Sequence, residues 1–166
     1  MLFFKVLLKN LFAGPSTEAF PFAEAATPEA YRGKVVFDAS ACVGCKMCEH
    51  VCPGGAIRFE EHSDGLHFMI WHNTCVTCGL CSHYCVTKAI RLSNDWRLSH
   101  TQDQKYKMTD QAVVTYAACG KCGAPIMPAA DALVKLAYRG VSQRTGHLMN
   151  LCPDCRRVAS VSAEVK

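Results

Sequence analysis

The sequence predicts a small α+β fold made of two similar halves, followed by a second cysteine-rich module. Eight of the twelve cysteines form two runs of equal spacing, Cys42-x2-Cys45-x2-Cys48-x3-Cys52 and Cys75-x2-Cys78-x2-Cys81-x3-Cys85. A shift of 33 residues, the difference between 75 and 42, places residues 42–57 on residues 75–90, which indicates a duplication. Each run is followed by apolar-polar alternation, at Ala56–Phe59 and Ala89–Leu92, which is typical of a β-strand.

The spacing within each run is the one that holds 4Fe-4S clusters in bacterial-type ferredoxins. Three thiolates on a tight loop bind three corners of one cluster, and the fourth thiolate, farther along the chain, reaches the other cluster. We therefore expect a two-4Fe-4S ferredoxin-like fold that carries electrons, in which neither half folds alone. The expected ligands are Cys42, Cys45, Cys48 and Cys85 for the first cluster, and Cys75, Cys78, Cys81 and Cys52 for the second.

Zinc and disulfides are the alternatives for such runs of cysteines. Zinc sites usually contain paired Cys-x2-Cys units rather than four cysteines in one run. Dense disulfide frameworks belong to small secreted chains, whereas this sequence has 12 cysteines in 166 residues and no convincing signal peptide. The two copies of the four-cysteine run favour iron-sulfur clusters over both alternatives.

The segment between the two runs predicts a β-hairpin. Residues 66–72 alternate between apolar and polar, and residues 60–65 have the composition of a turn. Residues 32–95 are therefore expected to form the two-cluster domain. Residues 96–118 are expected to be a polar connector to the C-terminal module.

The two runs differ at the residue that follows the fourth cysteine. Pro53 follows Cys52, but Val86 follows Cys85 and has a backbone N–H that proline lacks. A hydrogen bond from this N–H to a cluster sulfur would raise the reduction potential of that cluster. The sequence therefore predicts that one cluster has a somewhat higher potential.

The remaining four cysteines predict a second metal site in residues 119–158, before a short tail at 159–166. They form two Cys-x2-Cys pairs, Cys119 with Cys122 and Cys152 with Cys155. Two such pairs present four thiolates tetrahedrally, which indicates a structural zinc in a zinc-ribbon-like module. A rubredoxin-like single iron and unmetallated thiols are the alternatives. Between the pairs, the apolar spacing of residues 129–138 predicts a short amphipathic helix.

Residues 1–31 are expected to form an amphipathic helix and an extended docking arm. Met1–Phe12 is almost entirely apolar except for Lys5, Lys9 and Asn10, and the two lysines lie one helical turn apart. Twelve residues are too few to span a bilayer, which needs about 20. The favoured interpretation is a helix that lies on a membrane or membrane-protein surface, with core packing and a signal peptide as alternatives. The prolines of residues 13–31 indicate an arm that contacts a neighbouring protein.

Composition and motifs argue against several other functions. The net charge is only +4 and its basic residues are scattered, so nucleic-acid binding is not indicated, although a metal-stabilised nucleic-acid-binding module is the alternative from a different class. The sequence has no recognisable nucleophile, phosphate loop or open metal site, so substrate chemistry in this chain alone is not expected. The seven histidines are expected to pack or to face solvent, because twelve thiolates fill the predicted sites.

Taken together, these motifs resemble the iron-sulfur subunit of membrane-bound group 4 NiFe hydrogenases, as in formate hydrogenlyase. The resemblance rests on the apolar N-terminal helix, the arm, Tyr31-Arg32-Gly33-Lys34, the two cysteine runs and the final four cysteines. It implies a peripheral subunit on the cytoplasmic side of the cell membrane. Its implied partners are the small and large hydrogenase subunits, membrane-arm subunits, and a soluble donor such as formate dehydrogenase, carbon monoxide dehydrogenase or ferredoxin.

The two-cluster peripheral subunit of respiratory complex I is a related alternative. It resembles residues 31–90 but usually lacks the final four cysteines. In that case the electrons would be relayed to a quinone site. A free ferredoxin with an appended ribbon is a third interpretation.

Overall fold

The computed structural model describes residues 2–14, 17–18, 20, 22–130, 133–134, 137 and 143–161. The chain divides into two compact units, Met1–Tyr31 and Arg32–Lys166. Within the described part of the chain, no helix has both the length and the apolar character needed to cross a membrane.

The first unit contains one helix, α1 (Leu2–Ala13), as the sequence predicts. It ends at Gly14, whose positive φ of 74° is the left-handed conformation that commonly terminates helices. Its large apolar side chains from Phe3 to Phe12 are exposed, and five of them are more than half exposed: Phe3, Phe4, Leu7, Leu11 and Phe12. No helix or strand lies among the described residues between Gly14 and Val35.

The described residues of the second unit form three antiparallel sheets, two of which belong to the region of the two cysteine runs. Strands β1 (Val35–Phe37) and β4 (Ile90–Leu92) form one pair. Strands β2 (Ile57–Glu61) and β3 (Gly65–Trp71) form the predicted hairpin, in which the turn is only the three residues 62–64 because β2 continues to Glu61. The strands expected after each cysteine run are therefore confirmed as β2 and β4.

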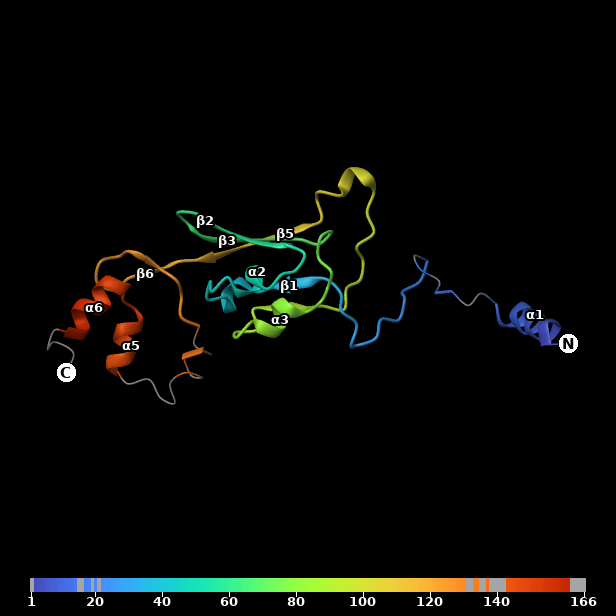
Figure 1. The fold of residues 1–166 in the computed structure, drawn as a ribbon, viewed down its shortest axis with the longest axis horizontal. Helices are drawn as coiled ribbons and strands as arrows, with labels where there is room; N and C mark the ends of the chain where they lie inside the picture. Colours follow the sequence, from blue (N-terminus) through green and yellow to red (C-terminus); the bar gives the residue numbers. More distant parts are fainter. Residues whose placement is uncertain are drawn as a thin grey trace. The chain divides into compact units, whose positions relative to one another are not determined.

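A third strand, β5 (Thr109–Thr115), pairs with β3 along its whole length and gives the sheet order β2-β3-β5. Figure 1 shows the three strands side by side. This strand lies inside the region that the sequence indicates only as a connector. Of its seven residues only Val114 is buried, so its apolar alternation is too weak to be recognised from sequence.

The core of this unit combines aromatic side chains and cysteines. Phe68 is 1% exposed; its ring stacks on Phe37 with centroids 3.9 Å apart and meets Phe59 edge-on at 5.3 Å. Short helices α2 (Met47–His50) and α3 (Leu80–Tyr84) carry the buried Cys48 and Cys81 into the same apolar cluster. The core and the cysteine sites are therefore continuous, so loss of one is expected to weaken the other.

Replacing Phe68 by alanine is expected to destabilise the second unit by about 3–5 kcal/mol, because the substitution leaves a cavity at the centre of the aromatic cluster. The measurement is the denaturant midpoint for bleaching of cluster absorbance under anaerobic conditions. Val113→Ala is the control, because Val113 lies on the same sheet but is 38% exposed. A midpoint for Phe68→Ala equal to that of the control would contradict this account of the core.

The duplication is also visible in the backbone. Three pairs of positions that are 33 residues apart in the sequence all have positive φ, with a glycine in one copy and a larger residue in the other: Gly44 and Thr77, Lys46 and Gly79, Gly55 and Lys88. Left-handed backbone is costly for residues other than glycine. The shared backbone conformation of the two loops is therefore set by the fold rather than by the residue types at these positions.

The C-terminal module consists of a short hairpin and helices. Strands β6 (Ala117–Ala118) and β7 (Pro125–Ile126) pair with each other, and α5 (Gln143–Met149) and α6 (Pro153–Val161) follow. Neither α5 nor α6 is predicted from the sequence. Half of the predicted helix at 129–138 lies outside the described residues, and of the rest, residues 133, 134 and 137 are helical.

Candidate iron-sulfur and metal sites

The first cavity gathers four cysteines from both runs. Cys42 and Cys45 lie on the loop before α2, Cys48 lies within α2, and Cys85 follows α3. The rest of the wall is mostly apolar and includes Phe37, Phe59 and Ile90. These are the four cysteines that the spacing assigns to the first cluster.

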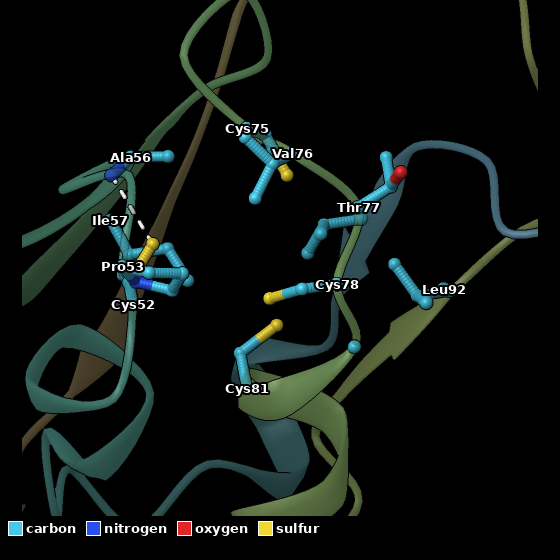
Figure 2. A pocket seen from close by; sticks show the side chains of 12 residues that line it. Cys52, Pro53, Ala56, Ile57, Cys75, Val76, Thr77, Cys78, Cys81 and Leu92 are labelled. Carbon is cyan, nitrogen blue, oxygen red and sulfur yellow. Dashed lines mark hydrogen bonds between the residues drawn. The ribbon is translucent and has the colours of Figure 1, made fainter.

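The second cavity is lined by the other four cysteines of the two runs. Figure 2 shows the side chains of Cys52, Cys75, Cys78 and Cys81 directed toward a common space, with Cys52 approaching from the opposite side to the other three. Val35, Ile57 and Leu92 complete its wall. The two cavities thus exchange their fourth cysteines, as the sequence predicts for interlocked sites.

Backbone amides point at the sulfurs in both cavities. Gly44 N–H donates to Cys42 Sγ at 3.3 Å, and Ala56 N–H donates to Cys52 Sγ at the same distance. Amide donors stabilise the negative charge that thiolates and reduced clusters carry. The loops therefore supply both the ligands and their hydrogen bonds.

The cavities are poor environments for free thiolates. Burial raises the pKa of the Cys48 thiol to about 12 and that of Cys81 to about 11, and it also raises the pKa values of Cys42 and Cys75. Four thiolates in one apolar space need a cationic group to stay ionised, because burial disfavours charge. This donor set fits a 4Fe-4S cluster in each cavity.

The pKa of the Cys85 thiol is shifted in the opposite direction to the pKa values of Cys42, Cys48, Cys75 and Cys81. Burial alone would raise the pKa of its thiol, but hydrogen bonds from the Ile90 amide and from Thr87 outweigh this and hold the pKa below its usual value. The Thr87 hydroxyl oxygen lies 3.6 Å from Cys85 Sγ. Thr87 is not part of the cysteine motif, and the sequence indicates only the Val86 amide as a possible donor.

Three of the histidines lie within or just before the cysteine runs in the sequence. His50 and His83, at equivalent places in the two runs, are exposed. His72 is 4% exposed, and its Nε2 lies 2.7 Å from a carboxylate oxygen of Asp110 on β5. None of these three lines either cavity.

The last four cysteines form a third site. The sulfurs of Cys119, Cys122, Cys152 and Cys155 all lie within 4.8 Å of one another. The first pair lies in the turn between β6 and β7, and the second pair lies at the start of α6. The second pair is thus on a helix rather than in a β-hairpin, so the module differs from a zinc ribbon in this half.

The hydrogen bonds of this third site favour an ionised sulfur at Cys119 but a protonated one at Cys155. Cys152 N–H donates to Cys119 Sγ at 3.2 Å, and Cys155 N–H donates to Cys152 Sγ at 3.4 Å. Amide hydrogen bonds from Cys122 and Cys152 lower the pKa of Cys119 to about 6, whereas hydrogen bonds with the other thiols raise the pKa of Cys155 to about 12. Four thiolates so close together fit a metal cation with no open ligand position.

The similarity of this chain to known proteins agrees with the cysteine sites described above. Residues 41–89 match the family described as the 4Fe-4S dicluster domain. The chloroplast NAD(P)H-quinone oxidoreductase subunit I of Agrostis stolonifera is 38% identical over 39 residues, which cover 24% of this chain and 22% of that protein. The F420H2 dehydrogenase subunit I of Methanosarcina mazei is 37% identical over 54 residues, which cover 32% of this chain and 30% of that protein.

Solved structures are also similar to this chain, among them that of the membrane-bound sulfane sulfur reductase, an archaeal respiratory membrane complex. Its identity is 27% and its TM-score 0.48, with 61% of this chain and 56% of that chain covered. The chain spans less than a third of the two relatives above. The family match of residues 41–89 and the geometry of their eight cysteines lead to one conclusion. These residues form a 4Fe-4S dicluster domain within a mixed helix-and-sheet fold of the ferredoxin type.

Proposed function

We propose that this chain is an electron-transfer subunit that relays electrons through two 4Fe-4S clusters within a membrane-bound respiratory complex. The main support is the pair of four-cysteine cavities, each completed by a cysteine from the other run, within a dicluster domain. When bound, a 4Fe-4S cluster accepts and releases single electrons. The thiolates hold the clusters, the amides of the loops stabilise the sulfurs, and the apolar walls limit access of water.

Two kinds of parent complex agree with this role. The final four cysteines favour a NiFe hydrogenase, in which this chain would link a soluble donor such as formate dehydrogenase, carbon monoxide dehydrogenase or ferredoxin to the hydrogenase small subunit. The similarity to NAD(P)H-quinone oxidoreductase subunit I favours a complex I type assembly that reduces a quinone. In both, the chain contacts subunits of a membrane arm.

Purification of the native complex under anaerobic conditions tests this proposal. Subunits are identified by mass spectrometry, and iron, nickel and zinc are measured per copy of this chain. Nickel together with a hydrogenase large subunit supports the hydrogenase relay, whereas a nickel-free assembly with quinone-reductase subunits supports the complex I type. A chain that purifies alone, as a soluble monomer, contradicts both.

We place this chain on the cytoplasmic face of the membrane, and the exposed helix α1 supports a peripheral position there rather than a membrane-spanning one. Phe3, Phe4, Leu7 and Leu11 lie on one side of an ideal helix, and Lys5 and Lys9 lie on the opposite side. This distribution suits a helix that lies in a membrane interface or on a membrane subunit.

The third site is proposed to hold one structural zinc. Anaerobically purified chain is expected to contain about one zinc in addition to its iron, because four thiolates without an open position suit this metal. Replacing Cys119 and Cys152 together by serine is expected to remove the zinc while the iron content stays unchanged. A ninth iron with the absorption of a single Fe–thiolate centre would instead identify a rubredoxin-like site.

A further inference from the structure

The two cysteine runs also differ at positions 87 and 54, which are equivalent in the duplication. Thr87 follows Cys85 by two residues, and the residue 33 positions earlier, which follows Cys52, is Gly54. Thr87 lines the first cavity together with Cys85. At this position the first cavity therefore has a hydroxyl group, and the second has no side chain.

The Thr87 hydroxyl lies within hydrogen-bond distance of the neighbouring sulfur. Its oxygen is 3.6 Å from Cys85 Sγ, and either atom can donate while Cys85 is a thiol. A thiolate bound to iron has no proton, so the hydroxyl is then the donor. The described residues that hydrogen-bond this sulfur include Thr87, Ala89 and Ile90.

The fold prevents an equivalent hydroxyl at Gly54. A Cβ atom there would lie 2.5 Å from the carbonyl oxygen of Thr74, which is closer than side-chain carbon atoms approach a backbone oxygen. Thr77 does line the second cavity, but its hydroxyl has no hydrogen-bond partner among the described residues. The difference between the cavities is therefore built into their loops.

We propose that Thr87 is a positioning residue that acts through Cys85 and raises the reduction potential of the cluster held by Cys42, Cys45, Cys48 and Cys85; this rests on the proposed electron-transfer function. Reduction adds a negative charge that is shared by the cluster and its sulfurs. A hydroxyl that donates to one of these sulfurs stabilises the reduced form more than the oxidised form. The two clusters then differ in potential, and an electron shared between them favours the first cavity.

Redox titration of the full chain with both clusters, followed by electron paramagnetic resonance, tests this proposal. Thr87→Val keeps the shape of the side chain but removes the hydroxyl, and it is expected to lower one midpoint potential and leave the other unchanged. Thr87→Ser retains the donor and is expected to restore the wild-type value. Thr77→Val makes the same chemical change in the second cavity and is expected to shift neither midpoint.

Each other outcome has a definite meaning. Unchanged midpoints in Thr87→Val overturn the proposal, and so does an equal shift in Thr77→Val. If Thr87→Val loses the iron of one cluster while Thr87→Ser keeps it, the hydroxyl serves assembly, which also overturns the proposal. The proposed electron-transfer function is judged separately, because it fails only if the wild-type chain has no reversibly reducible 4Fe-4S signal.

Discussion

Replacing Cys52 and Cys81 together by alanine is expected to remove only one cluster and to leave about 4 iron atoms per chain in place of about 8. These residues lie in different runs of the sequence, but both line the second cavity. Replacing Cys48 and Cys52 together is expected to leave almost no bound iron. These two lie close together in one run, but Cys48 lines the first cavity and Cys52 the second.

The two double variants each lose two thiolates, so they are matched controls for one another. Iron analysis and the resonance spectrum of the reduced chain give the number of clusters that remain. If each run held its own cluster, the results would be reversed: the Cys48 and Cys52 variant would keep one cluster, and the Cys52 and Cys81 variant would lose both. That reversal would disprove the interlocked assignment.

The sequence predicts the parts of this fold that repeat. The two cysteine runs, and the strands that follow them, are found because a cluster requires fixed ligand spacing and because β2 and β4 begin with buried apolar residues, Ile57 and Ile90. The positive φ values at equivalent positions have the same origin in the duplicated loop. The helix α1 is found because its twelve residues are almost continuously apolar.

The parts that the sequence does not reveal depend on long-range contacts. Strand β5 has one fully buried side chain, Val114, and its pairing with β3 is made by backbone hydrogen bonds that leave little pattern in the sequence. The role proposed for Thr87 depends on the short distance between its hydroxyl oxygen and Cys85 Sγ. The cysteine motif does not specify a residue at position 87. Met127, which precedes the C-terminal helices, packs against the core of the two-cluster domain, a contact that spacing alone does not predict.

Replacing Leu7 and Leu11 together by glutamate is expected to abolish association of this chain with its membrane complex. Both side chains are more than half exposed and lie on the apolar side of α1, one helical turn apart. Burying a leucine contributes roughly 1.5–3 kcal/mol, so losing two is expected to weaken association by at least about 100-fold. The measurement is the fraction of the chain that sediments with membranes and co-purifies with partner subunits.

Replacing Lys5 and Lys9 together by glutamine is the control for this variant, because it changes the net charge by the same two units on the opposite side of the helix. It is expected to weaken association less than the leucine variant does, by at most about 30-fold, since the attraction of each lysine to an anionic surface is worth about 1 kcal/mol. A larger loss in the lysine variant than in the leucine variant would show that charge, rather than the apolar side, holds the helix. Full co-purification of both variants would mean that α1 has no anchoring role, and that the second unit alone binds the complex.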